Sequence, residues 1–174
     1  MLQLMFSIRP LSANVSIVIG GAPVAADLAA IKAAGFSTLV DFRIDGEAQA
    51  KEAATITRKA AEALGLAYFR IPAAKHELFT DAVVAPAAAL LGGTQGPILA
   101  HCASGQRAAI IWAAATARRE PVGAVLKALR NAGFEFEFLR DDLEAQADRG
   151  RWMTQDSTEP VPAATKPAIE REAA

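Results

Sequence analysis

The amino-acid sequence predicts an α/β fold of three layers, in which helices flank a central, mostly parallel sheet. Short apolar runs rich in strand-forming residues alternate along the chain with alanine-rich segments of helical period. Clusters of glycine and proline separate these segments, as turns do. This alternation places helices on both faces of a parallel sheet, and such sheets bind ligands at the carboxyl ends of their strands.

The first half of the chain predicts four strands and two helices. Gly20 and Gly21 end the second strand, Gly35 ends the first helix, and Pro72 ends the fourth strand. Between these breaks the apolar residues recur either in short runs or at helical spacing. The strands are expected at residues 5–8, 15–19, 37–42 and 67–71, and the helices at residues 24–34 and 47–64.

The second half predicts one more strand among helices. After a loop that follows Pro72, a helix is expected to run to about Leu91, with Thr80 or Asp81 as its N-cap. Pro86 would kink this helix or move its start. The strand is expected at residues 98–101, and further helices at residues 107–118, 121–132 and from about 138.

Composition limits the class of protein. The 174 residues are 52% apolar, which is enough for one domain, expected at residues 1–150, before a disordered tail at residues 151–174. A net charge of -1 gives no reason to expect nucleic acid as a partner. Polar residues interrupt the apolar start of the chain, so no membrane span is expected there. A single cysteine favours a reducing compartment, by default the cytoplasm.

That cysteine, Cys102, follows the expected strand at residues 98–101 and precedes an apolar helix that begins near Arg107. The N-terminal N–H groups and positive end of such a helix stabilise a thiolate and an oxyanion beside it. Arg107 adds a planar group that can hold two oxygens at once. The loop between them, which we expect to bind the anion through its backbone, consists of Ala103, Ser104, Gly105 and Gln106.

The chain resembles the phosphatase-like domain family of beta-lactamase hydrolase-like proteins, a bacterial branch of the tyrosine and dual-specificity phosphatase superfamily. The resemblance covers roughly residues 19–133. It is carried by Gly21-Ala22-Pro23, by DLAAIKAAGFSTLVDFR with the following Asp45-Gly46-Glu47, and by GPILAHCASGQRA. It implies that Cys102 attacks a phosphate ester and forms a phosphocysteine, without a metal or other cofactor. The partner would be a phosphorylated small molecule or a phosphoprotein.

The same resemblance implies supporting residues around the cysteine. Superfamily phosphatases take the proton for the leaving oxygen from an aspartate on a mobile loop, which resembles residues 72–81 here and makes Asp81 the candidate general acid. Capping of the following helix is the structural alternative for Asp81, and His76 and Glu77 are alternative acids on that loop. His101 would hydrogen-bond to the backbone of the cysteine loop.

Two departures from the phosphatase pattern keep other functions open. Four residues separate Cys102 from Arg107, where ordinary tyrosine phosphatases have five, and Ala108 stands where they carry a serine or threonine. Four is also the loop length of rhodanese-like sulfurtransferases, in which the cysteine would carry a persulfide between a sulfur donor and an acceptor. A third possibility is a catalytically silent phosphate-binding module.

A group of charged residues follows the strand at residues 37–42. A solvated charged turn is the expected structure here, in preference to an ion-pair network that shapes the pocket. The group consists of Asp41, Arg43, Asp45 and Glu47.

Overall fold

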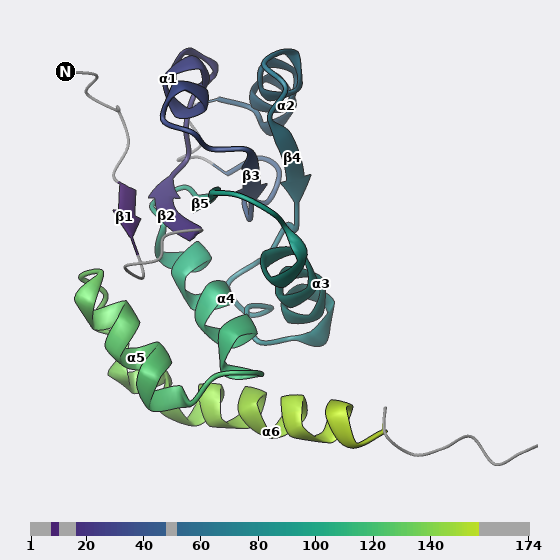
Figure 1. The fold of residues 1–174 in the computed structure, drawn as a ribbon, viewed down its shortest axis with the longest axis vertical. Helices are drawn as coiled ribbons and strands as arrows, with labels where there is room; N and C mark the ends of the chain where they lie inside the picture. The colour runs from purple at the N-terminus through teal and green to yellow at the C-terminus, as the bar shows by residue number, and fades with distance from the viewer. Residues whose placement is uncertain (1–7, 11–16, 48–51, 157–174) are drawn as a thin grey trace, which may run out of the picture.

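The computed structural model describes residues 8–10, 17–47 and 52–156, and in them it has a single five-stranded sheet (Figure 1). The strand order is β1-β2-β5-β3-β4; β2, β5, β3 and β4 run parallel, and β1 pairs antiparallel with β2 at one edge. The strands are β1 (Ile8–Pro10), β2 (Ile17–Gly21), β3 (Thr38–Asp41), β4 (Ala67–Arg70) and β5 (Ile98–Cys102). The predicted fold class is confirmed.

Helices cover both faces of the sheet, with α1 and α2 on one side and α3 and α4 on the other (Figure 1). Beyond α4 lie α5 and α6. The helices are η1 (Ala25–Asp27), α1 (Leu28–Ala33), α2 (Ala54–Ala63), α3 (Asp81–Gly93), α4 (Gln106–Ala117), α5 (Val122–Asn131), η2 (Glu137–Leu139) and α6 (Arg140–Asp156).

Most expected elements are present, with shifted ends. The first expected strand, at residues 5–8, lies mostly outside the described residues, and the described strand begins at Ile8. The helix expected at residues 47–64 begins only at Ala54. Pro86 lies inside α3 without moving its start from Asp81. Helix α6 continues past the boundary expected at residue 150 and ends at Asp156.

The alternation of side chains along each strand divides the core into two halves. One set of strand residues packs with α1 and α2, and includes Val18, Leu39 and Leu99. The next residues along the same strands point the other way, toward α3, α4, α5 and α6; they include Ile19, Val40, Ile98 and Ala100. The last residue of β5, Cys102, belongs to this second half.

Helix α4 is the centre of the second half of the core. It contacts α3, α5, α6 and β5, and eight of its twelve residues are buried. Its many alanines let neighbouring helices approach closely. At its far end a Cβ atom added to Gly150 of α6 would lie 2.1 Å from the carbonyl oxygen of Arg118, so only glycine fits this crossing. The direction of α4 is therefore fixed by contacts on all sides.

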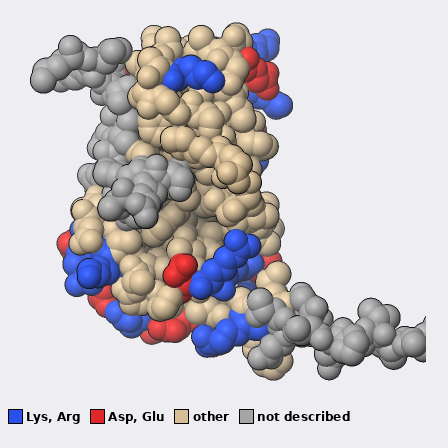
Figure 2. Space-filling view, viewed as in Figure 1, with Lys and Arg blue, Asp and Glu red and all other residues tan. Residues whose placement is uncertain are grey.

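The face drawn in Figure 2 is largely uncharged in the middle. Charged side chains of both signs gather at its lower end, where Figure 1 places α5 and α6, and others lie at its upper end, where Figure 1 places α1 and α2. Of the helices in the described parts of the chain, none combines the length and the apolar character needed to cross a bilayer.

Replacing Leu143 by alanine tests whether α6 belongs to the main core. The Leu143 side chain is fully buried, so we expect Leu143→Ala to lower the free energy of unfolding by about 2–5 kcal/mol. Phe138→Ala is the matched control, because that side chain is 74% exposed, and we expect a change within about 0.5 kcal/mol. Urea denaturation of the two variants measures both, and equal effects would contradict this packing.

Candidate active site

The loop after β5 turns the chain sharply at Cys102. Gly105 has a φ of +92°, a conformation that side chains other than glycine's rarely adopt, and α4 begins at the next residue. This turn points the Gly105 N–H group back at the cysteine, to whose Sγ it donates a hydrogen bond of 3.2 Å. The first N–H groups of α4 have no partner within the helix and face the same region. The loop therefore has the geometry of an anion site.

The end of β2 lies directly against this loop. The N–H of Ala22 approaches the carbonyl oxygen of Ala103 at 3.4 Å. A Cβ atom on Gly21 would lie 3.2 Å from that oxygen, and one on Gly105 would lie 3.1 Å from the carbonyl oxygen of Gly20. Gly21, expected to end a strand, and Gly105 thus also make room for the close approach of the cysteine loop to β2.

Arg107 is held from β3 and the segment after it. Its Nη1 donates a hydrogen bond of 3.0 Å to the carbonyl oxygen of Phe42, and its Nη2 forms an ion pair with Glu47. The side chains of Arg107 and Glu47 are only 15% and 7% exposed. Fixing one edge of the guanidinium in this way leaves its orientation little freedom, which suits the binding of an oxyanion.

The charged group after β3 is a buried ion-pair network, so the expected solvated turn is wrong. The guanidinium of Arg43 forms a bidentate pair with Asp41, with contacts of 2.9 Å and 2.7 Å, and both side chains are fully or almost fully buried. Tyr68 of β4 donates a hydrogen bond of 2.5 Å to the same carboxylate. Of the four residues, only Asp45 is strongly exposed, and it pairs with Arg70 at 3.0 Å.

These neighbours determine the protonation of Asp41. Burial by itself would raise the pKa of this carboxyl group, but the hydrogen bond from Arg43, the nearby His101 and the hydroxyl of Tyr68 together lower the pKa below its ordinary value. Asp41 is therefore ionised at neutral pH. Burial and the hydrogen bond to Asp41 raise the pKa of Tyr68, so its phenol stays protonated.

His101 faces away from the loop that it precedes. Consecutive strand residues point to opposite faces, so Cys102 faces α4 while His101 lies opposite Asp41 of β3, with Nδ1 3.8 Å from Oδ1. Neither ring nitrogen has a hydrogen-bond partner among the residues described. The bond to the loop backbone that the resemblance implied is therefore not formed. Burial lowers the pKa of His101 to about 4, so the ring is neutral at pH 7.

A cavity of about 600 Å³ opens over the cysteine loop. Cys102, only 2% exposed, lies at its base. The expected loop before α3 and the first turns of α4 supply its walls, through Lys75, Leu78 and Ile110, which are not among the site residues expected from the sequence. The lining residues are Lys75, Leu78, Cys102, Ala103, Ser104, Gln106, Arg107 and Ile110.

The structure does not bring Asp81 to this cavity, which corrects its expected place at the site. Its carboxylate pairs with Arg118 and Arg149. Arg118 follows the last residue of α4, about 16 Å along the helix axis from Arg107 at the first turn. The hydrogen bond from Arg118 lowers the pKa of Asp81, so this group is ionised and already paired at neutral pH.

Neither of the two alternative acids lines the cavity. Glu77 accepts a hydrogen bond of 2.8 Å from the N–H of Ala74 within its own loop. His76 is exposed and does not line the cavity. Thr80 occupies the N-cap position of α3, but its hydroxyl donates to the carbonyl of Glu77 and caps no N–H group.

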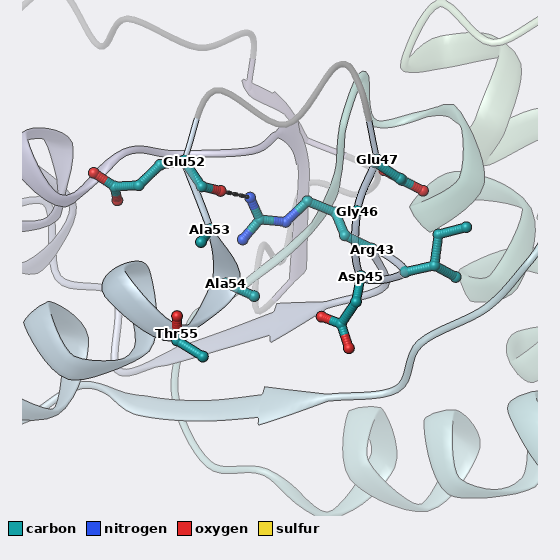
Figure 3. A pocket seen from close by; sticks show the side chains of 9 residues that line it. Arg43, Asp45, Gly46, Glu47, Glu52, Ala53, Ala54 and Thr55 are labelled. Atoms are coloured by element: carbon teal, nitrogen blue, oxygen red, sulfur yellow. Dashed lines mark hydrogen bonds between the residues drawn. The ribbon is translucent and has the colours of Figure 1, made fainter.

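A second cavity, of about 290 Å³, adjoins the buried network. In Figure 3 the Arg43 side chain reaches across it to the backbone of Glu52, where its Nη1 donates a hydrogen bond of 3.0 Å. Glu47 extends in the opposite direction, which agrees with its pairing to Arg107. The segment from β3 to Glu47 thus supports Arg107 on one side and is anchored on the other.

Comparison with known proteins identifies relatives over most of the described chain. The family model described as "Beta-lactamase hydrolase-like protein, phosphatase-like domain" matches residues 8–119. A beta-lactamase hydrolase-like protein of Agrobacterium fabrum (strain C58 / ATCC 33970) is 31% identical over 99 residues, 57% of this chain. That match covers only 23% of the relative, so this chain corresponds to about a quarter of it.

Solved structures show the same fold at low sequence identity. A proposed phosphatase of Neisseria meningitidis Z2491 has a TM-score of 0.67 and 23% identity, over 80% of this chain and 97% of that one. A kinase-associated phosphatase, solved with serine in place of its catalytic-site cysteine, has a TM-score of 0.62 and 13% identity, over 92% and 99%. A proposed phosphatase of Shewanella putrefaciens CN-32 has a TM-score of 0.57 and 15% identity, over 84% and 89%.

The buried His101 makes a testable contribution to pH dependence. Its pKa of about 4 in the folded protein lies below the ordinary 6.5, so between these values the unfolded chain binds the proton more readily. The free energy of unfolding should therefore fall as pH falls from 6.5 to 4, by on the order of 3 kcal/mol at most. Urea denaturation across this range measures the fall, and His101→Gln should lose most of it.

If His101→Gln does not fold, NMR of the histidine rings can test the lowered pKa of His101 directly. The chain has two histidines, so in His76→Gln the remaining ring signal belongs to His101. That signal should stay in its neutral form down to about pH 5. A ring that takes up its proton near pH 6.5 would contradict the burial described above.

Proposed function

This chain belongs to the family of phosphatase-like domains of beta-lactamase hydrolase-like proteins, and we propose that it is a cysteine-dependent phosphatase acting on phosphate esters. The observation that carries the proposal is the loop in which Cys102 receives the N–H of Gly105 at the start of α4, with Arg107 fixed beside it. Cysteine, helix end and arginine then face one cavity. The phosphatase-like fold of the chain agrees with this chemistry.

In the first step the thiolate of Cys102 attacks phosphorus. An S–P bond forms, the P–O bond to the leaving group breaks, and its electron pair leaves with that oxygen. Arg107 and the N–H groups at the start of α4 hold the remaining phosphoryl oxygens, whose negative charge the helix end also stabilises. The product of this step is a phosphocysteine.

In the second step water attacks the phosphocysteine, the S–P bond breaks and inorganic phosphate leaves. The sulfur takes back its electron pair and becomes a thiolate, which the N–H of Gly105 stabilises. Ala108, fully buried, has no hydroxyl group to help the sulfur leave. We therefore expect hydrolysis of the intermediate to be the slower step, with a burst of leaving group before steady turnover.

A sulfurtransferase is the second candidate, favoured by the four-residue spacing of Cys102 and Arg107 and by Ala108. In that reaction the thiolate attacks the outer sulfur of a donor such as thiosulfate. An S–S bond forms, the bond to sulfite breaks, and an acceptor thiol later removes the persulfide sulfur. Incubation with thiosulfate would then add one sulfur atom to the protein, visible by intact mass.

Turnover by Cys102→Ser tests the nucleophile. We expect the native protein to release phosphate from an aryl phosphate and the variant to lose this activity by about 10³-fold or more, because serine is not ionised at neutral pH. Thiocyanate formation from thiosulfate and cyanide is measured in parallel. Thiocyanate formation without phosphate release would assign the loop to sulfur transfer instead. No product in either assay would favour a phosphate-binding module without catalytic activity.

Arg107→Lys tests the role of the fixed guanidinium. A lysine cannot bond to the carbonyl of Phe42 and to Glu47 while also presenting two N–H groups to a phosphate. We expect kcat/KM for an aryl phosphate to fall by about 10²-fold and vanadate inhibition to weaken in parallel. Arg58→Lys on the exposed surface of α2 is the control and should leave both unchanged.

A further inference from the structure

Among the described residues, the cavity over Cys102 is lined by no carboxylic acid or histidine, the groups that commonly protonate the leaving oxygen of an ordinary alkyl phosphate. The nearby carboxylates are already engaged: Glu47 pairs with Arg107, and Glu77 accepts an N–H of its own loop. Asp81 pairs with Arg118 beyond the opposite end of α4.

Lys75, from the loop before α3, is the charged side chain that lines this cavity besides Arg107. It is exposed, and together with Leu78 and Ile110 it forms the wall above the cysteine loop. A lysine ammonium at that place can attract a negative charge that develops on a departing oxygen. The neighbouring Leu78 and Ile110 offer apolar contact to the body of the same leaving group.

We infer that the site acts on phosphoryl compounds whose leaving group departs as a stable anion, and that Lys75 stabilises this anion; this rests on the proposed function. Such leaving groups are aryl or enol oxygens, carboxylates and phosphates. When the P–O bond breaks, the electron pair stays on the leaving oxygen, and no proton has to be supplied in that step. Phosphate esters of simple alcohols would be poor substrates, because their leaving oxygen needs a proton.

The test is a series of aryl phosphates of decreasing phenol acidity, from 4-nitrophenyl to phenyl phosphate, compared by kcat/KM. This parameter covers the steps up to release of the phenol, so the later hydrolysis of the phosphocysteine does not enter it. We expect kcat/KM to fall by about 10²-fold or more across the series, the range that a general acid would otherwise supply. Nearly equal values would show that a proton donor is present and would overturn the inference.

Lys75→Met tests the role of the ammonium group, and Lys127→Met, at an exposed position of α5, is the matched control. We expect Lys75→Met to lower kcat/KM by about 10-fold for phenyl phosphate and by less for 4-nitrophenyl phosphate, because more charge accumulates on the less acidic oxygen. Lys75→Arg should restore most of the loss. If Lys75 had a merely structural role, its replacement would lower kcat/KM equally for all substrates. If Lys75→Met and Lys127→Met had the same kcat/KM values, Lys75 would have no part in stabilising the leaving group.

Two outcomes separate this inference from the function on which it rests. If the native protein cleaves no aryl phosphate, the proposed phosphatase and the inference fail together. If it cleaves them through Cys102 with little dependence on the leaving group, only the inference fails. In that case the substitution among Asp81→Asn, Glu77→Gln and His76→Gln that makes the dependence steep identifies the donor.

Discussion

The contact on which the site depends is the close approach of the cysteine loop to the end of β2. The loop turns between β5 and α4 through Gly105, which adopts a left-handed conformation. It packs closely against the backbone of β2, because a Cβ atom on Gly21 or Gly105 would lie 3.2 Å or 3.1 Å from a carbonyl oxygen. That turn decides where the N–H groups at the start of α4 point. Helix α4 is in turn enclosed by β5, α3, α5 and α6, so packing fixes the helix and the helix fixes the anion site.

A second constraint positions the arginine from the carboxyl end of β3. Asp41 and Arg43 pair below the sheet and Tyr68 completes the buried network, while Phe42 between them points its side chain into the opposite core. The carbonyl of Phe42 is thereby presented to Arg107. Burying an ion pair costs desolvation that its attraction only partly offsets, so its main consequence here is one defined geometry for this segment.

Local pattern was sufficient to predict the layers, most strands and helices and the cysteine loop, because each depends on residues adjacent in sequence. The pairing of Glu47 with Arg107 could not be predicted in this way, since sixty positions separate them and only the sheet brings them together. Asp81 is the last residue of the loop expected to carry the general acid, but its partner Arg118 follows the last residue of α4, at the end of that helix opposite Arg107. The orientation of His101 could have been predicted from the alternation of side chains along a strand, because the neighbour of Cys102 must face the other side of the sheet.

At the carboxyl ends of β3 and β5, the two faces of the sheet therefore differ in function. On the α4 side are the sulfur, the helix N-terminus and the cavity. On the α1 and α2 side is a buried polar network with a neutral histidine and an ionised aspartate. Because neither His101 nor Asp41 reaches the cavity, neither can exchange a proton with a substrate held there. The chemistry open to the site is then set by sulfur, arginine, backbone N–H groups and Lys75, all of which stabilise negative charge. A site composed in this way favours reactions in which an anion attacks and an anion leaves.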